Sequence, residues 1–273
     1  MKPDLNTNIS TTDLTETLSK PTILECENLS TKFHQQYAFK DISLSFDFNK
    51  IHAIVGPSGC GKTSFLMSIN RINQHLHGCS SEGKINYKGK NILTLDADLT
   101  MLRRQIGFVF QTPQPFPFSI EKNFTIPLKA HGIRNRQEIA DRIEHFLKLT
   151  GLWNEVKSRL HLPALALSGG QQQRLLIART LALEPELVLL DEPCSALDPI
   201  STRKIEDLLI DQRSRHTFIV VTHNLSQAKR IADTTTVFWQ DHDHGIVLEH
   251  NSSQHIFSSS ALPLTRRYIQ SAN

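Results

Sequence analysis

The 273-residue chain has little cysteine and no apolar run of the roughly 20 residues that a membrane-spanning helix needs. Its four cysteines, Cys26, Cys60, Cys79 and Cys194, form no C-x-x-C pair, which indicates free thiols in a reducing compartment. The polar, threonine-rich start has no apolar core of the kind that a signal peptide contains. We therefore expect a cytosolic protein that reaches any membrane through a partner.

An excess of charge of one sign is also missing. Thirty basic residues face 27 acidic ones, and the formal net charge of +3 is too small to indicate a nucleic-acid-binding surface. With 39% hydrophobic residues the chain has enough apolar side chains to bury a core. The composition predicts a globular protein without a nucleic-acid partner.

Hydrophobic periodicity predicts an α/β fold with several parts. Residues 1–21 lack periodicity and are predicted to be a disordered tail before a domain over residues 22–273. The alternating stretches TILECENLSTKF, AFKDISLSFDF and KINYKGKNIL predict half-buried antiparallel strands. The apolar runs KIHAIVG, ELVLLDEP and TFIVVTHN predict buried strands of a mainly parallel sheet. Helical spacing in EIADRIEHFLKLTGLWNEV predicts an inserted helical subdomain at about residues 112–166.

The stretch GPSGCGKT fits the pattern G-x-x-x-x-G-K-[ST], between an apolar strand and an amphipathic segment. Its glycines allow backbone N–H groups to converge on phosphate oxygens, and a helix N-terminus adds positive partial charge. Lys62 would bridge the β- and γ-phosphates, and the Thr63 hydroxyl would ligate Mg²⁺. A simple glycine turn would not account for Lys-Thr at the helix start. The predicted nucleotide-binding residues of this loop are Gly56, Pro57, Ser58, Gly59, Cys60, Gly61, Lys62, Thr63 and Ser64.

Adjacent carboxylates follow the apolar strand LVLLDEP. Asp191 would hold Mg²⁺ through water, and Glu192 would act as the general base that polarises the attacking water. A solvent-facing acidic pair is the alternative, but a phosphate loop already needs a carboxylate for its magnesium. The pair therefore indicates the second half of a P-loop NTPase site.

The segment LSGGQQQRLLIARTLAL opens a helix with a second set of free N–H groups, at Ser168, Gly169 and Gly170. One nucleotide does not need both the phosphate loop and this second anion-binding segment of one subunit. The pattern therefore favours a homodimer with each ATP held between two chains. For this motif alone, an ordinary helix cap is equally consistent. The candidate nucleotide contacts are Ser168, Gly169, Gly170 and Gln171.

Taken together, the motifs resemble those of the ATP-binding-cassette ATPases over most of the chain, from Ile23 to about Phe257. They are GPSGCGKT, Gln111, LSGGQ, LVLLDE, SALD at residues 195–198 and TH at residues 222–223. The resemblance implies an ATPase that uses ATP and Mg²⁺, in which Gln111 senses magnesium and the γ-phosphate. It also implies that Asp198 couples the two sites of the dimer and that His223 contacts the γ-phosphate and orients the water.

The same resemblance implies that Phe33 stacks on adenine. A role in the strand core is the alternative for Phe33, and Tyr37 is a less favoured substitute for the stacking residue.

The runs GPSGCGKTSFLMSINRIN, FVFQTPQPFPFSIEKN, ALALSGGQQQRLLIART and LLDEPCSALDPIST are similar to the ATP-binding subunit of bacterial phosphate importers. This implies a peripheral subunit at the cytoplasmic face of the inner membrane, with two transmembrane permease subunits and an external phosphate-binding protein. An importer of another solute, such as amino acids, is the alternative. A soluble cassette protein of DNA repair or translation is less favoured, because this chain has no long coiled coil and no second cassette.

Two further segments leave alternatives open. Pro115, Phe116, Pro117 and Phe118 are candidates for a groove that receives a coupling helix of the membrane subunits, or for a solvent-shielded turn. His242, Asp243 and His244 alternate on an expected exposed turn, and we predict no metal site there.

Overall fold

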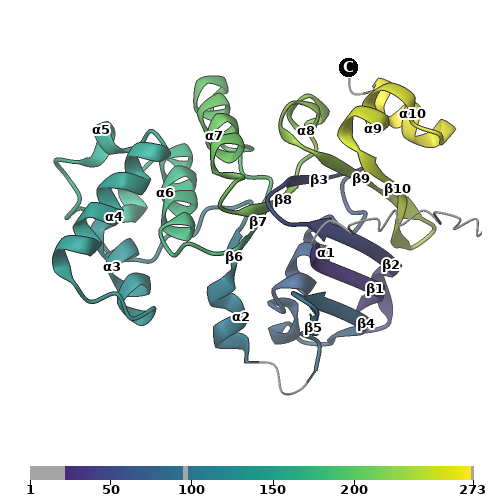
Figure 1. Cartoon of the computed structure of the whole chain (residues 1–273), viewed down its shortest axis with the longest axis horizontal. Helices are drawn as coiled ribbons and strands as arrows, with labels where there is room; N and C mark the ends of the chain where they lie inside the picture. The colour runs from purple at the N-terminus through teal and green to yellow at the C-terminus, as the bar shows by residue number, and fades with distance from the viewer. Residues whose placement is uncertain (1–21, 95–97, 272–273) are drawn as a thin grey trace, which may run out of the picture.

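The computed structural model describes residues 22–94 and 98–271. The predicted tail, residues 1–21, lies outside the described residues. The described strands form one sheet in the order β5-β4-β1-β2-β10-β9-β3-β8-β7-β6. Figure 1 shows this sheet in the middle of the molecule, with helices α3 to α6 gathered on one side of it.

One end of the sheet is antiparallel, as the alternating stretches predicted. Its strands are β1 (Thr22–Phe33), β2 (Gln36–Asp47), β4 (Cys79–Tyr87) and β5 (Lys90–Asn91). Strand β1 pairs antiparallel with both β2 and β4. On β2 the buried residues Ile42, Leu44 and Phe46 alternate with exposed ones, because only one face of this part meets the core.

The other end contains the parallel strands that carry the site. They are β3 (Ile51–Val55), β6 (Ile106–Val109), β7 (Leu187–Asp191) and β8 (Thr217–Val221). Every residue of β3, β7 and β8 is buried. Figure 1 shows why: α1 (Lys62–Ile69) and α2 (Leu99–Gln105) lie below these strands, whereas α7 (Pro199–Gln212) and α8 (Leu225–Ile231) lie above them. The predicted α/β class with a buried parallel sheet is confirmed.

A hairpin that was not predicted from the sequence joins the two ends. Strand β9 (Thr234–Asp241) runs parallel to β3, and β10 (His244–Ser252) returns antiparallel to β9. Strand β10 meets β2 at one register position, where Gly245 faces Phe39. A Cβ on residue 245 would lie 2.2 Å from the carbonyl oxygen of Cys60, so only glycine fits at this close approach. The phosphate loop therefore rests on the joint between the two parts of the sheet.

Residues 112–166, the predicted helical subdomain, contain α3 (Ile120–Ala130), α4 (Arg136–Leu149) and the short α5 (Trp153–Val156). The side chain of Asn135 caps α4 by accepting from the backbone N–H groups of the first turn. Four apolar residues of α4 at helical spacing, Ile139, Ile143, Phe146 and Leu147, are buried in the core that α6 (Gly169–Leu181) shares.

The remaining helices are α9 (Ser253–Ser259), α10 (Pro263–Ser271) and two single 3₁₀ turns, η1 (Asn73–His75) and η2 (Ala164–Ala166). Figure 1 places α9 and α10 beside α8 and the β9–β10 hairpin. Among the helices of residues 22–94 and 98–271 there is no candidate for a membrane-spanning segment.

Candidate nucleotide-binding site

The phosphate loop connects β3, which ends at Val55, to α1, which begins at Lys62. Gly61 at the helix start has a φ of 89°, and a Cβ there would lie 2.6 Å from the carbonyl oxygen of Ala38. Glycine is therefore required for the turn. Within the part of the chain that the structure describes, no side chain caps the N-terminus of α1, so its backbone N–H groups are available to an anion.

The loop borders a cavity of about 280 Å³. Its lining residues are Ala38, Ser58, Gly59, Gly61, Lys62, Thr63, Ser64, Gln111 and Glu192. The Lys62 ammonium folds back and donates to the carbonyl oxygens of Gly56, at 2.8 Å, and Pro57, at 2.6 Å. The Cys60 side chain is buried in the core, 3.8 Å from the Lys62 ammonium, and burial raises the pKa of its thiol. Cys60 can therefore contribute its backbone to the loop, but its thiol is not placed to react with a nucleotide.

Thr63 and Asp191 come together at the mouth of the loop. The Thr63 hydroxyl donates to the Asp191 carboxylate, 2.9 Å from Oδ2 and 3.2 Å from Oδ1. Asp191 is buried at the end of β7, and this burial raises the pKa of its carboxyl, while the Thr63 hydrogen bond opposes the shift. A hydroxyl and a carboxylate are hard oxygen ligands of the kind that Mg²⁺ prefers, so these two residues fit a magnesium site.

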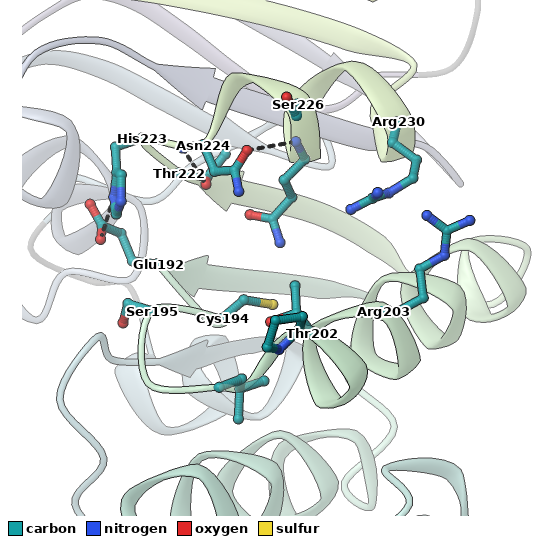
Figure 2. A pocket seen from close by; sticks show the side chains of 13 residues that line it. Glu192, Cys194, Ser195, Thr202, Arg203, Thr222, His223, Asn224, Ser226 and Arg230 are labelled. Carbon is teal, nitrogen blue, oxygen red and sulfur yellow. Dashed lines mark hydrogen bonds and ion pairs between the residues drawn. The ribbon is translucent and has the colours of Figure 1, made fainter. Parts of the chain in front are cut away.

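Glu192, Gln111 and His223 meet at the carboxyl ends of three neighbouring parallel strands. The Oε2 atom of Glu192 accepts from the Gln111 side-chain amide at 3.1 Å and lies 2.9 Å from Nδ1 of His223. Figure 2 shows the His223 ring directed at the Glu192 carboxylate. Because β6, β7 and β8 are adjacent, the residues that follow them lie at one edge of the sheet, where α/β proteins bind ligands.

The backbone of Glu192 holds its side chain in this position. Its φ is 46°, in the left-handed region that is costly for a residue with a Cβ. The Glu192 N–H donates to the carbonyl oxygen of Val221 at 2.9 Å, which ties this turn to the end of β8. The turn directs the carboxylate toward His223, which follows the same strand.

The LSGGQ segment forms the N-terminus of α6. Ser168 caps the helix, and Gln171 completes a capping box, with N···O distances of 3.3 Å and 3.1 Å. The Gln171 amide also donates to Glu155 at 2.7 Å, and Glu155 pairs with the nearly buried Arg174 at 2.7 Å. Ser168, Gly169, Gly170 and Gln171 do not line the phosphate-loop cavity of the same chain. Within one subunit the LSGGQ segment and the phosphate loop therefore do not line the same cavity.

Asp198 and Phe33 also lie outside that cavity. Asp198 caps α7 by accepting from the N–H groups of Ile200 and Ser201, both at 3.0 Å, and hydrogen bonds from Ser201 lower the pKa of its carboxyl. Phe33 is half-buried at the end of β1, opposite Gln36 and Cys79. The ring of Tyr37 is flanked by the ammonium groups of Lys32 and Lys40.

A family model described as ABC transporter matches residues 39–195. The chain belongs to the ABC transporter family. Two curated relatives are Phosphate import ATP-binding protein PstB 2 of Listeria innocua and PstB of Borreliella burgdorferi. The first is 45% identical over 98% of this chain and 97% of its own length. The second is 46% identical over 93% of this chain and 96% of its own length.

Solved structures agree with this family fold. An ATP-binding cassette, determined as a dimer in a post-hydrolysis state with ADP and Pi, is 30% identical, with a TM-score of 0.73 over 84% of this chain and 98% of that one. CbiO1 from Clostridium perfringens, part of an ABC transporter complex, is 28% identical, with a TM-score of 0.71 over 88% of this chain and 92% of that one. The predicted P-loop NTPase fold with a helical subdomain is thereby confirmed.

In this ABC cassette, two side chains that were not predicted from the sequence shape the aromatic segment after Gln111. Asn123 on α3 accepts from the Phe116 N–H at 2.8 Å, and Arg179 on α6 stacks over the Phe116 ring at 4.3 Å. Pro115 is buried, whereas Phe116 and Phe118 are exposed. Arg179 lies far from Phe116 in the sequence, and Asn123 reaches Phe116 from the next helix, so neither contact leaves a periodic pattern. His242 and Asp243 lie in the exposed turn between β9 and β10.

Proposed function

We propose that the chain is the ATP-hydrolysing subunit of an importer that carries inorganic phosphate across the cytoplasmic membrane. The observation that carries the ATPase part is the Glu192 carboxylate, held by Gln111 and His223 beside the phosphate loop. The cargo rests on the phosphate-import relatives, which are about 45% identical over nearly the whole chain. Import of another solute, such as amino acids, is the second candidate.

In the proposed reaction, the N–H groups of the loop and the Lys62 ammonium bind the phosphates of ATP. Glu192 accepts a proton from a water molecule as its oxygen attacks the γ-phosphorus, and the bond from that phosphorus to the β–γ bridging oxygen breaks. His223 and Gln111 hold the Glu192 carboxylate in place. Thr63 and Asp191, with Gln111 nearby, would hold Mg²⁺, which when bound supplies positive charge against the phosphate oxygens.

The active unit in this proposal is a homodimer. Because Ser168 and Gly169 are exposed and lie apart from the loop of their own chain, a second copy would supply them to the ATP. Asp198 would then couple the two sites, and Phe33 would stack on adenine. The exposed Phe116 and Phe118 would contact one of two membrane-embedded permease subunits, which in turn would receive phosphate from an external binding protein.

Phosphate uptake at limiting external phosphate tests this function, in cells that carry a single version of the chain. We expect Lys62→Ala to abolish uptake, because it removes the phosphate-binding ammonium. Lys148→Ala is the matched control, since it removes an exposed lysine of α4 whose ion pair with Glu144 lies at the surface. If both variants import phosphate normally while purified Lys62→Ala no longer hydrolyses ATP, the cargo is wrong and amino-acid uptake becomes the next measurement.

A further inference from the structure

A second cavity, of about 680 Å³, lies between α7 and α8 (Figure 2). Glu192 lines both this cavity and the phosphate-loop cavity, and among the described lining residues it is the only one that the two share. His223 also borders the second cavity. The two spaces therefore meet at the carboxylate to which we assign the catalytic role.

The walls of the second cavity are rich in hydrogen-bond donors. Hydroxyl and amide side chains line it, among them Ser195, Thr202 and Ser226. Glu192 is the only carboxylate among its described lining residues, and two cations, Arg203 and Arg230, face it. Figure 2 shows these arginines reaching into the space from α7 and α8, at the end away from Glu192 and His223. A wall of this composition suits an anion rather than a cation or an apolar ligand.

The two arginines differ in how firmly they are held. Arg230 pairs with Glu206, which is completely buried and also accepts from Gln227 at 3.3 Å. Among the described residues, the one ion pair of Arg203 is a long, exposed contact, 3.7 Å from its Nε to Asp207. Each guanidinium has five N–H donors, so one ion pair leaves donors for a ligand. A fixed arginine and an adjustable one on facing helices can together bind the oxygens of a tetrahedral oxyanion.

We propose that this cavity is a binding site for inorganic phosphate, held between Arg203 and Arg230. Phosphate is available there from two sources, the hydrolysis reaction on the other side of Glu192 and the surrounding solution. A bound dianion adds negative charge to the cavity that Glu192 and His223 also line, and would slow turnover. The proposal concerns the cytoplasmic subunit alone and does not depend on which solute the transporter carries.

Calorimetric titration of the full, nucleotide-free chain with sodium phosphate at constant ionic strength tests the site. We expect Arg203→Ala to weaken phosphate binding roughly 10-fold, the scale of one lost charged contact. Arg213→Ala is the matched control, because Arg213, at the end of the same helix, also makes one long surface pair, 3.6 Å from Asp233, but lies outside the lining. Lys62→Ala distinguishes phosphate binding in this cavity from phosphate binding at the phosphate loop, because Lys62 lines only the latter. We expect this variant to retain phosphate binding.

A second arm measures steady-state hydrolysis at increasing phosphate concentration. We expect the inhibitory concentration to rise roughly 10-fold in Arg203→Ala and to stay unchanged in Arg213→Ala. Loss of phosphate binding in Lys62→Ala with native binding in Arg203→Ala would assign the phosphate to the loop and overturn the proposal. So would the absence of binding by the native chain at tens of millimolar phosphate.

Discussion

The Oε2 atom of Glu192 lies 2.9 Å from Nδ1 of His223 and accepts the Gln111 amide at 3.1 Å. Both contacts use the same oxygen, so these neighbours leave Oε1 for another partner. The left-handed backbone of Glu192 and its N–H bond to Val221 fix the direction of the side chain. The carboxylate is thus held in a defined orientation by the protein itself, which is what a general base requires.

Replacing Glu192 by glutamine keeps the shape of the side chain and removes its ability to accept a proton. We expect Glu192→Gln to bind ATP normally and to hydrolyse it roughly 10²–10⁴-fold more slowly, the usual effect of losing a general base. Nucleotide binding and phosphate production by the purified protein measure the two properties. Glu186→Gln, at the opposite end of β7, is the control, and near-native turnover by Glu192→Gln would remove Glu192 from this role.

A site shared between two subunits can be restored by mixing two inactive proteins. We expect Lys62→Ala and Ser168→Arg to be inactive separately and their mixture to regain part of the native ATPase rate. Each heterodimer has one site in which both the phosphate loop and the LSGGQ segment are native. The measurement is hydrolysis after subunit exchange, with heterodimers detected by distinct affinity tags. Heterodimers without any recovered activity would contradict the shared site.

Removing the Thr63 hydroxyl is expected to change the magnesium dependence of hydrolysis separately from nucleotide affinity. Thr63→Val removes the hydroxyl and keeps the branched shape, so we expect the Mg²⁺ concentration for half-maximal hydrolysis to rise roughly 10-fold or more. Thr63→Ser keeps the hydroxyl and should titrate like the native chain. Identical magnesium curves for the two variants would show that the hydroxyl is no ligand.

Buried His52 predicts a loss of stability in acid. Its Nδ1 lies 2.7 Å from the Thr234 hydroxyl and its Nε2 lies 3.0 Å from the Asp47 carbonyl oxygen, and burial lowers its pKa to about 4. The unfolded chain, with a histidine pKa of about 6.5, therefore binds more protons than the folded chain between these values. The stabilising contribution is complete above about pH 6.5 and declines as the pH falls toward 4, by about 2 kcal/mol at about pH 5.

Urea unfolding at neutral pH and at about pH 5 measures this contribution. We expect His52→Gln to reduce the difference in unfolding free energy between the two conditions by about 2 kcal/mol, whatever its effect at neutral pH. Burial also lowers the pKa values of His250 and His216, which act in the same direction, so some acid sensitivity remains in the variant. An unchanged pH dependence would contradict the assignment to His52.

Local patterns predicted the parts of the fold in which side-chain burial follows the chain. The alternation in β2 and the continuous apolar runs of β3, β7 and β8 correspond to one-sided and two-sided burial. Strand β6 was not predicted, because its four residues, IGFV, are too few to show a period. The β9–β10 hairpin was missed because its turn, Asp-His-Asp-His, lacks the usual Asn-Gly or Asp-Gly, and because β10 has few fully buried positions.

In the site, too, some residues were indicated by local motifs, whereas some contacts depend on tertiary structure. The motifs predicted that Thr63 and Asp191 lie close together at the carboxyl edge of the sheet, and the two residues are in contact there. The contact of Glu192 with His223 depends on a left-handed φ, and the pairing of Glu206 with Arg230 depends on how α7 packs on α8. Neither the unusual φ nor the helix packing leaves a periodic signal in the sequence.

Gly245 gives the phosphate loop an additional mechanical role. It sits where β10 meets β2, and a Cβ there would lie 2.2 Å from the carbonyl oxygen of Cys60. A Cβ on residue 61 would likewise lie 2.6 Å from the carbonyl oxygen of Ala38 on β2. The loop thus lies across the junction of β2 and β10, where the two parts of the sheet pair at one register position. A bound nucleotide that stiffens the loop would hold the antiparallel and parallel parts of the sheet together. We therefore expect the two parts to unfold as one cooperative unit with nucleotide and more independently without it.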